Sequence, residues 1–333
     1  MRVAIVNDAA LAVEALRRVV TTAGHVVVWV AKDGLEALKA CAREVPELIL
    51  MDLLMPVMDG VECTRRIMEQ SPCPILIVTS TVSGSYEKVY DAMARGALDA
   101  TDTPSPSDPD SIARLLKKIA TIGKLNAPAP ARVSSPHAPL APPLAGAPQP
   151  PLVAIGASTG GPRAVADVLT GLGPQFPAAV VICQHVDMQF APGLAAWLQS
   201  QSGWRVELAQ PGARATRGVA LLANTEHHMI LTGDVVGYTP RPIETPFRPS
   251  VDVMFKSLVG WRARAAAVLL TGMGRDGAEG LLALKQAGWL TIAQDQATSV
   301  VYGMPRAAAE LGAATSVLAI AAIAPALGAY FRR

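Results

Sequence analysis

The chain has 333 residues, of which 51% are apolar and 17% are charged, with a net charge of +2. This length fits two domains better than one, and the apolar share excludes a wholly disordered chain. The small net charge excludes a strong overall attraction to nucleic acid or anionic lipid. Residues 1–103 contain 10 Lys and Arg against 14 Asp and Glu, whereas the rest contains 19 against 13. These opposite balances favour a weak contact between two halves.

The segment 1–122 alternates short apolar runs with amphipathic stretches. Continuous Val, Ile and Leu runs between helical stretches predict a parallel sheet that is covered on both faces. We expect buried strands at 3–6, 26–30, 48–51 and 75–78, and a weaker fifth strand at 97–100. The expected helices are 11–20, 35–42, 61–68, 88–94 and 112–122.

The segment 123–150 is rich in Pro and Ala and lacks an apolar period. It predicts a semi-rigid, extended linker that is sensitive to proteases. The alternation resumes in 151–333, which predicts a second doubly wound, mostly parallel α/β domain. We expect strands at 152–155, 179–183, 206–208, 219–222, 229–232, 268–271 and 290–293. Helices are expected around 164–169, 193–199, 251–258, 278–287 and 304–311.

Two local features refine the second domain. Thr232-Gly233-Asp234 predicts a hairpin turn, and therefore an antiparallel excursion in the middle of the domain. The segment Leu311–Tyr330 is uncharged and long enough to span a bilayer, but its Gly, Pro and many Ala residues favour a buried strand followed by a short helix.

The start of the chain does not resemble a signal peptide, and the four Cys residues show no C-x-x-C pair. We therefore expect a cytoplasmic protein without membrane insertion.

Polar residues follow several strands of the first domain. Asn7 and Asp8 follow the first strand, Asp52 the third and Thr79 the fourth. Such strand ends meet at one edge of a parallel sheet, where Asp8 and Asp52 could hold a hard divalent cation and Asp52 could attack a phosphoryl group. The simpler interpretation, that each Asp only caps a loop, is weakened by Met55-Pro56-x-x-Asp59-Gly60 downstream.

With these motifs, residues 1–122 resemble a response-regulator receiver, a flavodoxin-like (βα)5 fold. The resemblance implies that Asp52 is the phosphoacceptor, that Asp8 and Thr79 belong to its acidic and switch positions, and that Asp8 and Asp52 bind Mg²⁺. Two residues depart from the family pattern: Asn7 replaces the first of two acidic residues, and Thr103 replaces a lysine that contacts the phosphoryl group. The missing lysine bears on the strength or kinetics of switching, and a blunted response to phosphorylation is one outcome to test.

The second domain opens with Gly156-Ala157-Ser158-Thr159-Gly160, a G-x-S-x-G pattern between a strand and a helix. Such a turn can expose a nucleophilic serine beside backbone N–H groups, although a phosphate-binding glycine loop or a plain turn has the same pattern. A nucleophilic serine needs a base and an orienting acid, and His185 and Asp276 follow two other strands of the same sheet. The competing His227 and His228 are adjacent and point to opposite faces of a strand, so His228 is expected to be a structural or pocket residue.

The motifs IGASTGG, QHV, RPSVDVMF, LLTGMGRDGAEGL and AQDQATSVVYGMP occur in this order in residues 151–333. They resemble the catalytic domain of chemotaxis protein-glutamate methylesterases, the CheB family, and the receiver–linker–esterase arrangement is similar too. The resemblance implies the triad Ser158, His185 and Asp276, with Thr159 and Met273 near the oxyanion. NDAALAVEALRR and MDLLMPVMDGVE look closest to members from surface-sensing Wsp-type clusters.

The same resemblance implies a phosphorylation-regulated serine hydrolase of chemosensory adaptation. Its substrates would be glutamate γ-methyl esters on chemoreceptors, and methanol would be released. Some members of the family also deamidate receptor glutamines. A CheA-type histidine kinase would be the phosphodonor, and the ester chemistry would need no cofactor. Three other functions are considered. These are a phosphorylation-driven binding protein, a receiver with a DNA-binding output, and a glycine-loop nucleotide binder. The sequence shows no basic recognition helix, which disfavours the DNA-binding output.

Overall fold

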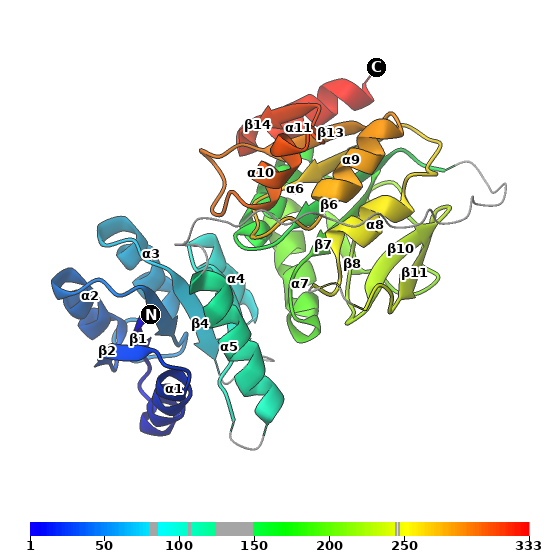
Figure 1. Cartoon of the computed structure of the whole chain (residues 1–333). Helices are drawn as coiled ribbons and strands as arrows, with labels where there is room; N and C mark the ends of the chain where they lie inside the picture. Colours follow the sequence, from blue (N-terminus) through cyan, green and yellow to red (C-terminus); the bar gives the residue numbers. More distant parts are fainter. Residues whose placement is uncertain (80–85, 106–107, 124–148, 244, 246, 333) are drawn as a thin grey trace. The chain divides into compact units, whose positions relative to one another are not determined.

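The computed structural model describes residues 1–79, 86–105, 108–123, 149–243, 245 and 247–332. The chain divides between Arg132 and Val133 into two compact units, each with its own sheet and core (Figure 1). The predicted linker, 123–150, lies outside the described residues except at its ends.

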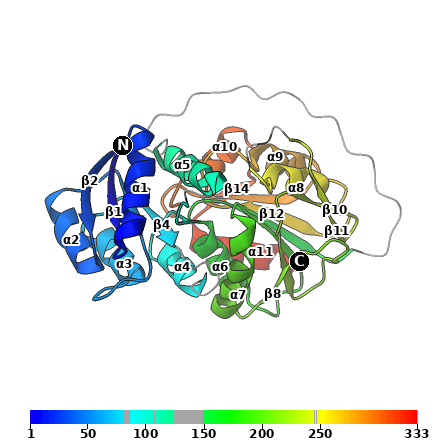
Figure 2. The same cartoon turned by 90° about the horizontal axis from the view of Figure 1, so that it is seen from below.

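The first unit is a five-stranded parallel sheet in the order β2-β1-β3-β4-β5. Helices α1 and α5 contact each other, and α2, α3 and α4 form a second series of neighbours (Figure 2). The strands are β1 (Arg2–Val6), β2 (Val26–Ala31), β3 (Leu48–Met51), β4 (Ile75–Thr79) and β5 (Asp99–Asp102). The helices are α1 (Ala10–Thr22), α2 (Gly34–Arg43), α3 (Gly60–Gln70), α4 (Tyr86–Ala94) and α5 (Pro109–Gly123).

Two details of this sheet differ from the sequence-based prediction. The strand β2 is only partly buried, because it lies at the edge of the sheet and has a neighbour on one side only. The fifth strand begins at Asp99 rather than at 97, since 97–98 lead in from the turn at Gly96, where φ is +117°. The polar residues Asp99, Thr101 and Asp102 hid this strand from an analysis of apolar runs.

The second unit contains a seven-stranded parallel sheet in the order β14-β13-β12-β6-β7-β9-β8. The antiparallel pair β10–β11 forms a separate small sheet, joined by the predicted turn at 232–234. The strands are β6 (Leu152–Ala157), β7 (Ala179–Gln184), β8 (Arg205–Leu208), β9 (Val219–Leu222), β10 (His228–Thr232), β11 (Val235–Thr239), β12 (Ala265–Leu269), β13 (Leu290–Gln294) and β14 (Ser316–Leu318).

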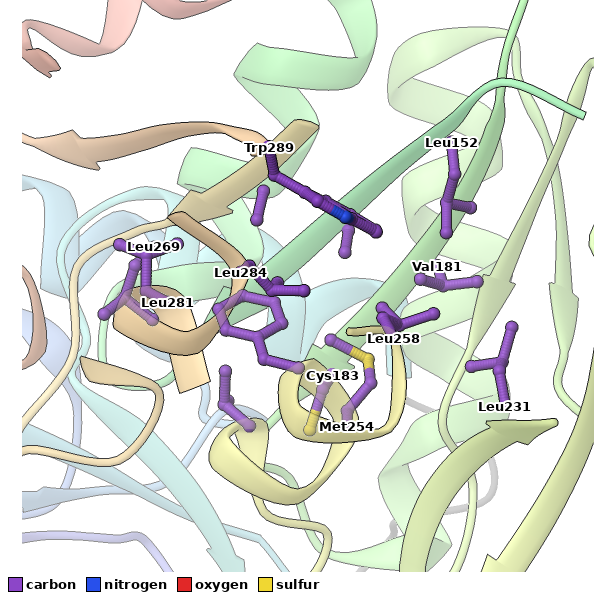
Figure 3. Packing of buried hydrophobic residues seen from close by; sticks show 14 of the residues in the cluster. Leu152, Val181, Cys183, Leu231, Met254, Leu258, Leu269, Leu281, Leu284 and Trp289 are labelled. Carbon is purple, nitrogen blue, oxygen red and sulfur yellow. The ribbon is translucent and has the colours of Figure 1, made fainter. Parts of the chain in front are cut away.

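Helices flank this sheet in two groups of neighbours. One group comprises α6 (Gly161–Leu172), α7 (Ala191–Ser202), which follows the short 3-10 helix η2 (Met188–Phe190), and α11 (Ile320–Phe331). The other comprises α8 (Val251–Ser257), α9 (Ala278–Gln286) and α10 (Met304–Glu310). Figure 3 shows side chains from α8 and α9, such as Met254 and Leu284, in one hydrophobic cluster with Leu152 and Val181 of the central strands. The doubly wound prediction is therefore confirmed.

The uncharged segment 311–330 forms a strand and a short helix, as expected. The strand β14 is not buried, however, because it lies at the edge of the sheet. The helix α11 contains Pro325, and no helix among the described residues is long and apolar enough to cross a membrane.

Both sheets change winding direction at a point that matters for function. In the first unit the direction changes between β1 and β3, and in the second it changes between β12 and β6. Ligands of such sheets bind beyond the carboxyl ends of the strands at this switch point. The residues after β1, β3, β6 and β12 are therefore the first candidates for functional sites.

Candidate active site and phosphoacceptor site

Ser158 lies on a tight turn between β6 and α6. Its N–H donates to the carbonyl oxygen of Thr271 at 3.0 Å, and its own carbonyl accepts from Gly161 N–H at 2.7 Å. Gly160 has a φ of +75°, a backbone conformation that other residues rarely adopt. A Cβ at this position would lie 2.6 Å from the Cβ of Val300, so a larger residue would also clash. Pro162 lies in the first turn of α6, where its missing N–H has no cost. The sequence therefore bends sharply at Ser158, which is 8% exposed.

His185 and Asp276 form a close pair beside this turn. His185 follows β7, and its N–H donates to the carbonyl oxygen of Ala157 at 3.0 Å. Its Nε2 lies 2.8 Å from Oδ2 of Asp276, and the two side chains are only 9% and 6% exposed. The structure thus brings together two residues that are 91 positions apart in the chain.

The Asp276 carboxylate is ionised and fully hydrogen-bonded. Oδ1 accepts from Ser250 Oγ at 2.7 Å and from Asp252 N–H at 3.0 Å, and Oδ2 accepts from Val251 N–H at 2.7 Å. Burial alone would raise the pKa of Asp276, but the hydrogen bond and charge of His185 and the donors Ser250 and Asp252 hold it below its ordinary value. A carboxylate facing Nε2 requires a proton on that nitrogen, so Asp276 fixes the tautomer of His185.

This tautomer leaves Nδ1 of His185 as the nitrogen that can accept a proton. Nδ1 is buried and has no hydrogen-bond partner within the described parts of the chain. Ala157 pairs with Gln184 in the β6–β7 ladder, so Ser158 and His185 are the next residues on two adjacent strands. No hydrogen bond joins the Ser158 hydroxyl to His185 among the described residues. Such bonds are often long without substrate and tighten when it binds.

Thr159 and Met273, expected near an oxyanion, lie next to Ser158. Thr159 follows it directly, and its carbonyl accepts from Thr271 Oγ1 at 3.0 Å. Met273 follows Gly272, where a Cβ would lie 2.8 Å from the Cβ of Ser158. In the part of the chain described, neither the Thr159 nor the Met273 N–H has an acceptor. Two free N–H groups beside a serine can stabilise an oxyanion.

Two further residues contact the His185–Asp276 pair and had no role in the sequence-based prediction. Phe247 stacks on the imidazole of His185, with ring centroids 4.3 Å apart and planes inclined by 8°. Ser250 donates to Asp276 and also caps α8. Ser250 lies inside the quoted motif RPSVDVMF, and Phe247 directly precedes it, but only the fold brings this segment to Asp276. His228, expected to be structural, is buried and accepts from Ser250 N–H.

The first unit contains a second polar site after β1 and β3. Asp52 is 9% exposed, and Asn7 Nδ2 donates to its Oδ2 at 3.1 Å, while Leu53 N–H donates to Oδ1 at 2.7 Å. Burial is the largest influence on the pKa of Asp52 and raises it, and the charge of Asp8 raises it further. Hydrogen bonds from the N–H groups of Leu53 and Leu54 lower this pKa in part. Asn7 therefore donates a hydrogen bond to the Asp52 carboxylate, whereas an acidic side chain at position 7 would repel that carboxylate.

The residues present fit a hard divalent cation. The Asp8 charge acts on the buried Asp52, and a cation between the two carboxylates would relieve their repulsion. Among the described residues no three His, Cys, Asp or Glu side chains cluster as metal ligands. Mg²⁺ keeps several waters and binds through one or two carboxylates plus phosphate oxygens, so Asp8 and Asp52 are the residues that would hold it.

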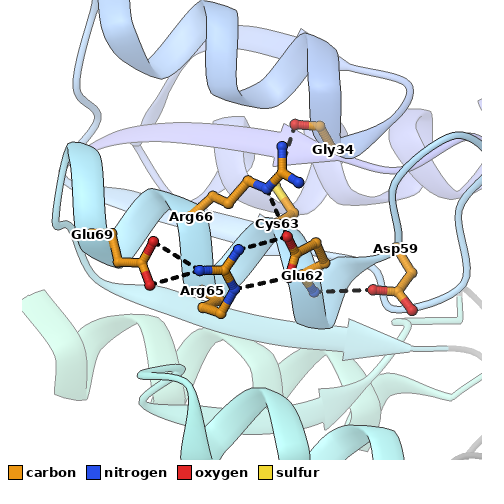
Figure 4. A network of polar contacts seen from close by, with 7 residues as sticks. All are labelled: Gly34, Asp59, Glu62, Cys63, Arg65, Arg66 and Glu69. Atoms are coloured by element: carbon orange, nitrogen blue, oxygen red, sulfur yellow. Dashed lines mark hydrogen bonds and ion pairs between the residues drawn. The ribbon is translucent and has the colours of Figure 1, made fainter.

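The loop after Asp52 brings the chain back over it. A Cβ at Gly60 would lie 2.1 Å from the carbonyl oxygen of Asp52, so only glycine allows this approach. Asp59 then caps α3 by accepting from Glu62 N–H at 3.0 Å (Figure 4). Asp59 and Gly60 of the predicted motif thus shape the loop that carries Asp52.

Thr79 and Thr103 lie side by side at the ends of β4 and β5. Thr79 is 1% exposed, and its carbonyl oxygen accepts from Thr103 N–H at 3.1 Å. No lysine pairs with Asp52 among the described residues, so the short Thr103 side chain supplies no cation there. The four Cys residues are free and buried, as the sequence suggests.

Comparisons with known proteins match both units of the chain. A family model described as CheB methylesterase matches residues 153–327, and one described as response regulator receiver domain matches residues 3–109. A protein-glutamate methylesterase/protein-glutamine glutaminase from Pseudomonas fluorescens is 51% identical over 333 residues, covering 98% of each chain. One from Burkholderia pseudomallei is 52% identical over 340 residues, covering 97% of this chain and 96% of the relative.

A solved structure resembles the second unit. The Thermotoga maritima CheB methylesterase catalytic domain is 34% identical, with a TM-score of 0.51, and the match covers 54% of this chain and 97% of that chain.

Proposed function

Because the chain belongs to the CheB family of protein-glutamate methylesterases and contains a receiver domain, we propose that it hydrolyses glutamate γ-methyl esters on chemoreceptors. Methanol and a glutamate carboxylate are the products. The same site would deamidate receptor glutamines and release ammonia, since an amide presents the same carbonyl to the nucleophile. The observation that carries this proposal is the buried His185–Asp276 pair beside Ser158.

Each step follows from the placement of these groups. Nδ1 of His185 takes the proton of Ser158 as Oγ attacks the ester carbonyl. The N–H groups of Thr159 and Met273 stabilise the oxyanion, and Asp276 stabilises the imidazolium through Nε2. His185 then protonates the leaving methanol, and water hydrolyses the acyl-enzyme by the same route. Loss of an orienting carboxylate of this kind can cost about 10⁴ in kcat.

Control of the esterase is assigned to the receiver. Asp52 is the phosphoacceptor, and a CheA-type histidine kinase is the phosphodonor. Asp8 and Asp52 would hold Mg²⁺, which offsets phosphoryl charge when bound. A phosphoryl group would add about −1.5 to −2 charges, by analogy with other phosphoresidues. Thr79 is the switch residue, and Thr103 predicts a reduced response.

Two finer assignments complete the proposal. The segments NDAALAVEALRR and MDLLMPVMDGVE support a place in the surface-sensing Wsp-type subgroup. The receiver and the buried, unpaired Cys residues support a cytoplasmic location, facing the receptor and kinase domains.

Methanol release from membranes with methyl-labelled chemoreceptors tests this function. Ser158→Ala removes the nucleophile but leaves the turn, so the rate should fall by at least about 10³-fold. Ser200→Ala is a matched control on the exposed part of α7 and should retain the wild-type rate. Wild-type turnover in the Ser158→Ala variant would refute the assignment.

A further inference from the structure

His228 is a fully buried histidine at the start of β10 whose ring is held at both nitrogens. Ser250 N–H donates to Nδ1 at 3.1 Å, and Nε2 lies 3.0 Å from the carbonyl oxygen of Pro242. A backbone N–H can only donate and a carbonyl oxygen can only accept, so the ring is neutral with its proton on Nε2. His228 therefore ties Pro242 and Ser250, which lie on either side of Phe247 in the sequence, to β10.

Two residues from this part of the chain, Ser250 and Phe247, contact the two members of the proton-transfer pair. Ser250 Oγ donates to Asp276 Oδ1 at 2.7 Å. The Phe247 ring stacks on the imidazole of His185 at 4.3 Å. A shift of Ser250 would therefore disturb the carboxylate, and a shift of Phe247 would disturb the base.

We propose that His228 is a positioning residue of the hydrolysis, which acts through Ser250 to hold Asp276, and with it His185, in the geometry that accepts the Ser158 proton. This inference rests on the proposed function. His228 itself contacts no reacting group, and its effect is carried by one backbone hydrogen bond and one hydroxyl.

The surroundings of His228 favour the neutral ring that this role needs. Burial is the largest influence on the pKa of His228 and lowers it, and the charges of Arg248 and His227 act in the same direction. The Pro242 carbonyl and the Asp276 charge oppose this shift but do not reverse it. At neutral pH the Nδ1 lone pair thus remains available to Ser250.

Three substitutions separate the two hydrogen bonds of the ring. His228→Asn places an amide oxygen near the position of Nδ1, His228→Gln places an amide nitrogen near the position of Nε2, and His228→Leu removes both. In methanol release by the full chain, kcat of the Asn variant should stay within about threefold of wild type, because Ser250 keeps its acceptor. The Gln and Leu variants should lose about 10- to 100-fold in kcat, with KM changed less than about twofold.

His227→Asn, at the exposed neighbour, is the matched control and should behave as wild type. Wild-type kcat in the Gln or Leu variant, or a loss in the Asn variant as large as in Leu, would overturn the inference. If His228→Leu does not fold, the comparison of Asn with Gln decides alone. A wild-type chain that releases no methanol refutes the proposed function, whereas an active wild type with unaffected His228 variants refutes only this role.

Discussion

Asp276 is the residue on which most of the hydrogen bonds of the esterase site converge. Three donors from 250–252 and one from His185 hold its carboxylate, so the acid is oriented before any substrate binds. Orientation before binding removes a reorganisation cost from the chemical step. The arrangement also has a consequence for the neighbouring carboxylic acid, Asp252.

Asp252 is forced toward its neutral form in the folded protein. Burial is the largest influence on the pKa of Asp252, and with the nearby charge of Asp276 it raises this pKa from 3.8 to about 7. The Gly280 N–H donates to Oδ1 of Asp252 at 2.6 Å and opposes part of this rise. Between these two values the folded state binds more protons than the unfolded state, so Asp252 lowers stability as pH rises from about 4 to about 7.

The substitution Asp252→Asn should therefore stabilise the domain at high pH. Asn is neutral at every pH and can still accept from Gly280. We expect the smallest difference in melting temperature near pH 4, and at pH 8 a further gain of about 1 kcal/mol or more, or about 2–4 °C. Calorimetry of both proteins across this range measures the difference. A difference that does not grow with pH would contradict the assigned pKa.

At the level of elements, the loop after β12 is packed directly against the nucleophile turn. A Cβ at Gly272 would lie 2.3 Å from Sδ of Met304 and 2.8 Å from the Cβ of Ser158. Gly272 also accepts from the N–H groups of Gly303 and Met304. Its missing side chain therefore sets the separation between the loop and Ser158.

The substitution Gly272→Ala should displace Ser158 and lower kcat by about 10²-fold, since small shifts of a reacting group have effects of this size. Gly237→Ala is the matched control, because its Cβ would lie 3.6 Å from Ile230, an ordinary contact. Steady-state methanol release measures both variants. Equal kcat values in the two would show that the loop does not fix the serine.

The elements themselves were largely predictable, because branched apolar runs between helical periods identify buried parallel strands. Besides β5, the strand β12 was misplaced: it was predicted at 268–271 but spans Ala265–Leu269. Its Ala265-Ala266-Ala267 run lacks the branched side chains that indicate a strand, although all three are buried in the centre of the sheet. The triad residues could be found at strand ends, whereas Phe247 and His228 could not, since their contacts with the site exist only after folding.

At the level of the whole molecule, the two units have separate cores, and a relative of the second unit has a solved structure as a catalytic domain. The second unit is therefore the fragment to assay by itself. The proposed control of the esterase by the receiver predicts that phosphorylation changes the esterase rate of the full chain.

Esterase rates of the full chain, with and without a small-molecule phosphodonor and Mg²⁺, should be compared with the rate of residues 151–333. We expect the unphosphorylated chain to be slowest, and we expect a modest increase on phosphorylation because Thr103 replaces the lysine. The Asp52→Asn variant should not respond to the phosphodonor. Equal rates for all three preparations would show that the receiver does not inhibit the esterase.

The most direct test of the account is covalent labelling of the nucleophile with an organophosphonate, with the label located by mass spectrometry. Ser158 should take up one phosphonyl group per chain, and methanol release should fall in proportion to labelling. Label on another residue at full inactivation, or undiminished methanol release from chains labelled at Ser158, would contradict the central claim that Ser158 attacks the ester.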